Sequence, residues 1–224
     1  MQSETNGSVT AQPLADHLRD ATRDAHTKAE QHAVQRAMVQ GHATAEHVAM
    51  HLAQSAIMHK SLEAALADSG DPRVKALYSL ALPRAGMAEQ GARALCPSTS
   101  FDTPEAAAIA SQVARDRADP ASLLGYFYVT EGSTNGNRYI LHAIMGSLRL
   151  REPLAFFDPY GESQRARWGE FRGVLNATVV SDAERERATL AAGRMFDWAS
   201  DLADEVARTL PLSPRLPITG PGPR

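Results

Sequence analysis

The sequence has a single cysteine, Cys96, among 224 residues. One thiol excludes an intrachain disulfide framework and any cysteine-rich zinc site. Aromatic residues are also few, at 6% of the chain, but hydrophobic residues reach 43% and the mean hydropathy is -0.31. A chain of this length and composition has enough apolar side chains for the core of one globular domain.

The chain has no excess of positive charge, since 23 lysines and arginines stand against 26 acidic residues, for a net charge of -3. This balance excludes a generally basic nucleic-acid binder. No apolar run approaches the roughly 18 residues of a membrane-spanning helix. The first dozen residues, MQSETNGSVTAQ, lack the apolar stretch of a signal peptide. We therefore expect a cytoplasmic protein with neither nucleic acid nor membrane as a partner.

Proline and glycine gather at the carboxyl end, where LPLSPRLPITGPGPR contains five prolines and two glycines. Such a composition favours an extended chain, and the polar amino end is also typical of a loose terminus. We expect a disordered segment over residues 1–12, one domain over 13–210 and a proline-rich flexible tail over 211–224.

Between the ends, apolar residues recur at helical spacing and no stretch alternates with a period of two. The pattern predicts about seven helices and no sheet, which makes the fold class all-α. Capping hydroxyls at Thr44, Thr103 and Ser181 mark three of the helix starts. The predicted helices cover residues 14–34, 44–69, 73–96 with an interruption at Pro83, 103–119, 121–149, 163–177 and 181–210.

One row of side chains stands out on the first predicted helix. Arg19, Arg23, His26 and Glu30 are spaced four, three and four residues apart, which places them on one helix face. An imidazole can bind iron, a carboxylate can hold its other ring nitrogen, and arginines pair with acid groups. The row suits a ligand that is anionic at one end and metallic at the other. The alternative is a solvated face of ion pairs.

A second unusual segment reads GYFYVTEGSTNGN over residues 125–137. Glycine inside a helix costs about 1 kcal/mol relative to alanine, so Gly132 and Gly136 need a reason. Four residues apart, they share a face on which bare backbone admits a flat ligand, beside polar side chains that suit ordered water. A close helix–helix crossing or a broken helix explains them equally well.

The two segments together resemble the biliverdin-forming heme oxygenase family, in particular its bacterial branch. LRDATRDAHTKAEQ (18–31) is similar to the family's proximal helix, and the similarity continues through HKSLEAAL (59–66). GYFYVTEGSTNGNRYI (125–140) resembles the distal helix, which bacterial members tend to write as Tyr-Val-x-Glu-Gly-Ser-x-x-Gly-Gly. LAFFDPYG (154–161) and RWGEFRGVL (167–175) resemble the turn and helix that follow. About 160 residues match in the same order.

The resemblance implies one heme b between the first helix and the glycine-containing helix. His26 would be the proximal iron ligand and Glu30 its partner, while Arg19, Arg23 and Arg172 would face the heme propionates. Gly132 and Gly136 would let heme and oxygen approach the backbone, and Ser133 stands where animal enzymes carry an aspartate that organises water. Asn135 and Asn137 depart from the family pattern. Two amides beside the oxygen site would crowd heme or donate to its bound ligand.

The reaction that the resemblance implies converts heme, oxygen and reducing equivalents into biliverdin, carbon monoxide and iron, so heme is both cofactor and substrate. The chain has no dinucleotide-binding glycine motif. Electrons would then come from a ferredoxin, flavodoxin or reductase, docked near Arg165 and Arg167. A bacteriophytochrome would be a possible acceptor of biliverdin. Both iron release and chromophore supply fit the sequence, and heme rotation in the pocket decides which meso carbon opens.

Two other functions are compatible with the residues. A heme carrier or sensor would keep the fold and lose turnover through Asn135 and Asn137. A dimetal oxidase would use Glu46, His47, His51 and His59, although such a site needs Glu-x-x-His pairs from two helices, which we do not find. We expect His47 and His51 to be an exposed pair.

Overall fold

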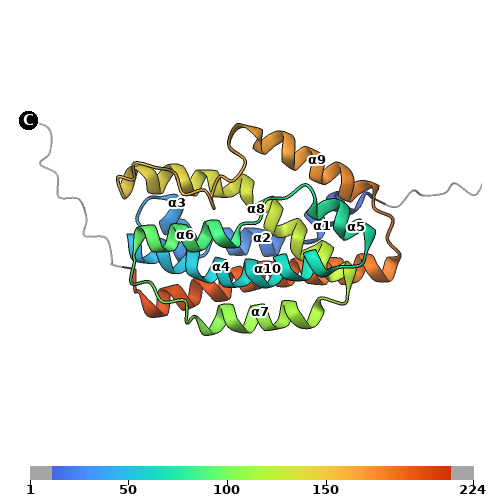
Figure 1. The fold of residues 1–224 in the computed structure, drawn as a ribbon, viewed down its shortest axis with the longest axis horizontal. Helices are drawn as coiled ribbons and strands as arrows, with labels where there is room; N and C mark the ends of the chain where they lie inside the picture. The colour runs from blue at the N-terminus through green and yellow to red at the C-terminus, as the bar shows by residue number, and fades with distance from the viewer. Residues whose placement is uncertain (1–11, 213–224) are drawn as a thin grey trace, which may run out of the picture.

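The computed structural model describes residues 12–212, and every regular element in that range is helical. Ten α-helices and one short 3-10 helix, η1, occur among these residues without any strand, which confirms the all-α expectation. Most helices run along the long axis of the molecule (Figure 1). The elements are α1 (Leu14–Ala21), α2 (Arg23–Glu30), α3 (Ala33–Val39), α4 (Ala45–Asp68), α5 (Pro72–Tyr78), α6 (Ala85–Leu95), α7 (Pro104–Asp116), α8 (Pro120–Ser147), η1 (Gly161–Ser163), α9 (Gln164–Ala177) and α10 (Asp182–Thr209).

The single helix predicted over residues 14–34 is wrong, because this segment forms α1, α2 and α3. At Thr22 the backbone leaves the helical region, with φ -107° and ψ 10°, and the hydroxyl donates to the Leu18 carbonyl at 2.7 Å. At the next break the His32 ring accepts from the Val34 amide and begins α3. Side chains that bond nearby backbone compete with the helix, and hydrophobic spacing does not reveal them.

Helix starts are mostly where the capping residues predict them. Thr44 and Ser181 each form a capping box, with His47 and Glu184 respectively. Pro104 occupies the first turn of α7 as expected, but the Thr103 hydroxyl makes no capping bond and is buried without a hydrogen-bond partner, so that cap is wrong. The interruption predicted at Pro83 is confirmed, because α5 and α6 are separate.

The core is built around α8 and α10, the two longest helices, which pack against each other. They approach very closely at Gly125, where a Cβ would overlap the Ala188 carbonyl oxygen and lie 3.0 Å from the Ala191 Cβ. A side chain at this position would push the helices apart. A close helix–helix crossing, one of the alternatives for Gly132 and Gly136, therefore occurs at Gly125.

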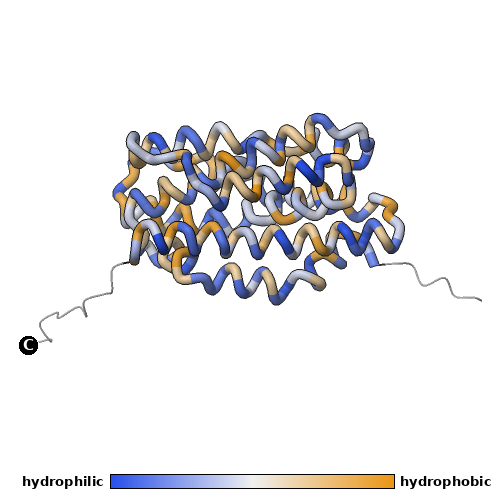
Figure 2. The backbone as a smooth tube through the Cα atoms, turned by 90° about the horizontal axis from the view of Figure 1, so that it is seen from below, coloured by the Kyte–Doolittle hydropathy of each residue, from blue (hydrophilic) through white to orange (hydrophobic). Residues whose placement is uncertain are grey.

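Helical spacing in the sequence predicts a buried stripe on α10 made of Met195, Ala199, Leu202 and Val206. The structure confirms it at Met195, Leu202 and Val206, which are 4%, 6% and 0% exposed. Ala199 is only half-buried, and the neighbouring Trp198 takes part in the core instead. Hydrophobic and hydrophilic residues alternate along each helix without long uniform runs (Figure 2). This pattern is typical of helices that bury one face and expose the other.

Within residues 12–212 no helix is long and apolar enough to cross a membrane. The predicted terminal segments, 1–12 and 211–224, fall almost entirely outside the described residues.

Candidate functional site

His26 lies in the middle of α2, with its ring edge against Phe196 of α10 at 5.3 Å between ring centroids. The side chain is 53% exposed, and its Nε2 lies 3.4 Å from Oε1 of Glu30 one turn later. Although the helix breaks at Thr22, the His26 amide still donates to the Thr22 carbonyl at 2.9 Å, so helical register continues. A carboxylate that holds one ring nitrogen leaves the other available to a metal.

The three predicted arginines differ in their surroundings. Arg19 and Arg23 both pair with Asp20, at 3.0 and 3.1 Å, and the hydrogen bond from Arg19 lowers the pKa of Asp20 to about 2. Arg172 reaches across from α9 to Asp16 at 2.7 Å, and Arg19 lies 3.3 Å from the same oxygen. The alternative prediction of a solvated face of ion pairs fits the observed contacts of Arg19 and Arg23. It does not explain the approach of Arg172 from a distant part of the chain.

The helix α8 continues without a break through its polar segment, in which side chains bond to the helix's own carbonyls. Each of these donors reaches back to a carbonyl three residues earlier. The bonds are Ser133 Oγ to Thr130 O at 2.7 Å, Thr134 Oγ1 to Glu131 O at 2.6 Å and Asn135 Nδ2 to Gly132 O at 3.0 Å. Such bonds compete with the helical ladder and often accompany a bend.

The two glycines predicted to form a bare face have different neighbours. A Cβ on Gly132 would lie 3.4 Å from Cη2 of Trp168 on α9. A Cβ on Gly136 would have nothing within 4 Å. Further along the helix Tyr139 is 73% exposed. The open backbone is therefore at Gly136, and the Gly132 end is covered by an indole.

Asn135, predicted to lie beside bound oxygen, is turned toward α9. Its Oδ1 accepts from Gln164 Nε2 at 3.2 Å while its Nδ2 donates to Gly132, so both ends of the amide are bonded. Gln164 also donates to Thr134 Oγ1 at 2.6 Å. In this arrangement the amide of Asn135 holds α8 against the start of α9. Asn137 is half-buried on the same helix.

The helices that carry His26 and the bare glycine are connected through their neighbours. Both α1 and α3 pack against α8, whereas α2, which lies between them in the chain, packs against α10. At the α3 end, a Cβ on Gly41 would lie 3.1 Å from the Ser147 Cβ of α8. His26 and Gly136 are both exposed, and each lies near the middle of its helix. The helices α1 and α3, which precede and follow α2 in the chain, connect α2 with α8.

Trp168, which the sequence did not single out, lies beside the predicted site residue Gly132. Its ring lies 5.8 Å from Tyr128 of α8 and stacks on Phe171 at 5.7 Å and 14°. Arg172 is one turn further along α9, so the two residues share a face. Burial raises the pKa of the Tyr128 hydroxyl, although the nearby positive charges of Arg172 and Arg19 oppose the shift. A tryptophan in the middle of an amphipathic helix gave no signal that distinguished it from core.

Sequence reasoning also missed a buried ion pair between Arg84 and Glu131 of α8. Arg84 is 2% exposed, donates to the Thr130 carbonyl at 2.5 Å and lies 3.6 Å from Glu131, itself buried. Tyr160 donates to Glu131 at 2.9 Å, and burial raises the pKa of its hydroxyl to about 12. The signal was a glutamate inside an otherwise apolar stretch of α8. This network fixes α8 immediately before Gly132.

The dimetal alternative is not supported. No group of three or more histidine, cysteine or acidic side chains able to hold a metal occurs in residues 12–212. The expectation that His47 and His51 form an exposed pair is also wrong. His47 is 5% exposed, bonding Thr44 at 2.8 Å and the Leu210 carbonyl at 2.9 Å, while His51 is half-buried and stacks on Phe157. Capping and packing account for both rings.

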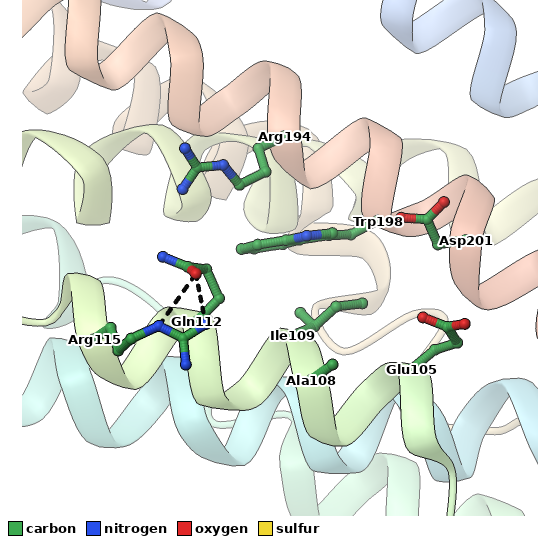
Figure 3. A pocket seen from close by; sticks show the side chains of 8 residues that line it. All are labelled: Glu105, Ala108, Ile109, Gln112, Arg115, Arg194, Trp198 and Asp201. Atoms are coloured by element: carbon green, nitrogen blue, oxygen red, sulfur yellow. Dashed lines mark hydrogen bonds between the residues drawn. The ribbon is translucent and has the colours of Figure 1, made fainter.

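A cavity of about 320 Å³ opens on another side of α10, between α7 and α10 (Figure 3). Its polar side chains mostly bond to neighbouring groups: Arg115 donates to Gln112, Arg194 to Asp116, and Arg208 to Glu105. Trp198 presents its flat ring to this space, and Tyr126 packs on the indole at 5.1 Å between centroids. None of the predicted site residues lines it.

Comparison with known proteins identifies a family and similar folds. The family model described as heme oxygenase matches residues 12–205. Among solved structures, heme oxygenase-1 of the cyanobacterium Synechocystis in complex with heme is 18% identical, with a TM-score of 0.79 over 88% of this chain and 94% of that one. The heme oxygenase of Leptospira interrogans is 19% identical, with a TM-score of 0.79 over 86% and 99%. Heme oxygenase-2 of Synechocystis, with heme and NO, is 22% identical, with a TM-score of 0.80 over 88% and 86%. No curated protein matches.

Proposed function

Because the chain belongs to the heme oxygenase family, we propose that it opens heme oxidatively to biliverdin, with release of carbon monoxide and iron, between α2 and α8. The observation that carries this proposal is a half-exposed imidazole on one helix and a bare, open backbone on the other. His26 is 53% exposed, and a Cβ on Gly136 would meet nothing within 4 Å. A glycine in the middle of a helix costs about 1 kcal/mol relative to alanine, so an open backbone at this position needs a reason.

The residues fit heme at three points. His26 would bind the iron through one ring nitrogen, with Glu30 holding the other in the correct tautomer. Arg172 and Arg19, which now converge on Asp16, would pair with the propionates. Gly136 would let the flat macrocycle approach the helix. Because Arg172 is already held across the gap between α9 and α1, binding requires it only to exchange one carboxylate for another.

Heme supplies the redox-active iron and the ring that is opened. The chain's part is to bind, orient and supply protons through water. A neutral imidazole donates less electron density to iron than a thiolate, which favours chemistry on the ring itself. The Ser133 hydroxyl donates a hydrogen bond to the Thr130 carbonyl, so its oxygen can still accept a hydrogen bond from water beside the bare backbone. No strong acid or base is needed at that position.

Oxygen and an external electron donor complete the proposed reaction. A ferredoxin, flavodoxin or reductase would dock near the exposed propionate end, where Arg165 and Arg167 add positive charge. Arg167 is already paired with Glu170 at 3.4 Å, so its contribution to docking is small. We further propose a cytoplasmic, bacterial setting, with a bacteriophytochrome as one acceptor of biliverdin.

The alternative of an inert heme carrier rested on Asn135 and Asn137 crowding the oxygen site. Asn135 is bonded to Gln164 and Gly132, which directs its amide away from the bare face. The alternative therefore loses one of its two supports, and turnover is the function that we favour.

The test is an absorbance time course of the protein with one equivalent of heme, given ascorbate or a ferredoxin–reductase system in air. The proposal predicts loss of the Soret band and a red-absorbing product that chromatography identifies as biliverdin. A Soret band that persists, with a donor proven on an active heme oxygenase, would favour the carrier. Absence of heme binding would overturn both.

A further inference from the structure

Trp168 is held firmly at one end of the bare face of α8. Its indole is partly buried against the core, stacks on Phe171 and lies 5.8 Å from the ring of Tyr128. These contacts hold the indole between Phe171 and Tyr128. The atom that projects farthest, Cη2, is the one nearest to Gly132.

The contact with Trp168 gives the two glycines of the bare face, Gly132 and Gly136, different surroundings. A Cβ on Gly132 would already lie in van der Waals contact with the indole, at 3.4, 3.8 and 3.9 Å from three of its atoms. One turn further, Gly136 has free space around it. A flat ligand can therefore reach the helix backbone at Gly136, while Trp168 stands in its way at Gly132.

Arg172 lies one turn along α9 from Trp168, on the same face, and is bonded to Asp16 of α1. If acid groups of the ligand pair with Arg172, the indole stands beside the adjacent edge of the macrocycle. An anchored edge and a rigid wall together limit rotation of a flat ring in its own plane. Neither of them does so alone.

We propose that Trp168 is the specificity-determining residue that fixes the in-plane rotation of heme, and so decides which meso carbon is opened. The inference rests on the proposed function and adds to it. The indole closes the Gly132 end, so that only the part of the macrocycle facing Gly136 lies against open backbone. A smaller side chain at position 168 would also leave space for the macrocycle at Gly132, and heme would then bind in two rotations.

The experiment compares the wild-type protein with Trp168→Leu and the milder Trp168→Phe. Proton NMR of the ferric cyanide complex is recorded with a two-fold symmetric heme, whose two faces are equivalent, so that the sets of heme methyl signals report in-plane rotation without any turnover. Chromatography of the product then separates the biliverdin isomers. Trp198→Leu is the matched control, because Trp198 faces the cavity between α7 and α10.

Wild type and Trp198→Leu are expected to give one set of methyl signals and one main isomer. Trp168→Leu is expected to give a second set and a second isomer at roughly a tenth of the total or more, as for a minor state that has lost its main restraint. Trp168→Phe should fall between them, and keeps the test valid should the leucine variant fold poorly. A single unchanged isomer and signal set in both Trp168 variants would overturn this inference alone. A wild type that binds no heme would overturn the proposed function as well.

Discussion

The two halves of α8 use glycine for opposite purposes. In the first half, residues 121–131 are buried almost without exception, and Gly125 is the point where α10 comes too close for any side chain. In the second half, Gly136 lies in open space and Tyr139 is 73% exposed. One glycine allows two helices to touch, and the other keeps a surface bare.

The comparison shows why a glycine pattern alone is ambiguous. A close crossing and a ligand face both require the absence of a Cβ, so the sequence supports both explanations equally. What separates them is the partner: the Ala188 carbonyl stands opposite Gly125, whereas no atom stands opposite Gly136. Substitutions that add a single methyl group should therefore have opposite effects in the two halves.

The largest effect is expected for Gly125→Ala. The new methyl group would overlap the Ala188 carbonyl and force α8 and α10 apart, at a cost of about 3 kcal/mol or more in the free energy of unfolding. Urea denaturation followed by circular dichroism measures it. A variant as stable as wild type would show that the crossing is looser than described.

A similar loss is expected on acidification, through the loop that supports the second half of α8. His51 stacks on Phe157, and burial lowers the pKa of its ring to about 4 from the ordinary 6.5. Between these two values the unfolded chain binds a proton that the folded protein does not. Stability therefore falls as pH drops from about 6.5 to about 4, by up to about 3 kcal/mol.

His51→Phe tests this directly, because phenylalanine keeps the ring against Phe157 and cannot take up a proton. The variant should lose less stability than wild type between pH 6.5 and pH 4 in thermal denaturation. The slope should not vanish, since burial also lowers the pKa of His59. Parallel curves for the two proteins would place the acid sensitivity elsewhere.

Much of this architecture could be predicted from local patterns. The cap at Thr44, the capping box at Ser181, the break at Pro83 and most of the stripe of α10 depend on neighbouring residues, and they are confirmed. The division of the first helix at Thr22 and the absence of a cap at Thr103 depend on which backbone group each hydroxyl bonds, if any. The spacing of hydrophobic residues does not determine that.

The site was only partly predictable for a related reason. The row from Arg19 to Glu30 follows from helical spacing, but the approach of Arg172 to Asp16 joins residues 156 positions apart. The indole of Trp168 over Gly132 and the buried pair of Arg84 and Glu131 are likewise long-range contacts. Resemblance to a family supplied Arg172, and nothing in the pattern supplied Trp168.

The smallest effect on stability, and the clearest contrast with Gly125, is expected for Gly136→Ala. Alanine in place of an unobstructed helical glycine should stabilise the protein by up to about 1 kcal/mol. The same methyl group would stand between α8 and heme and weaken heme binding by roughly tenfold or more. Gly146→Ala is the matched control, being in the same helix and also free of neighbours within 4 Å.

Thermal denaturation and heme titration, run on both variants, separate the two effects. Gly146→Ala should raise the melting temperature and leave the heme dissociation constant unchanged. If Gly136→Ala binds heme as tightly as wild type, the macrocycle does not lie against Gly136.

The most direct test of the account is the absorption spectrum of the ferric heme complex in His26→Ala, recorded with and without added imidazole. His142→Ala, which removes an exposed histidine from α8, is the control. The account predicts that His26→Ala loses the histidine-ligated spectrum of the wild type, that imidazole restores it, and that the control is unchanged. A wild-type spectrum in His26→Ala without imidazole would contradict the assignment of His26, and with it the site between α2 and α8.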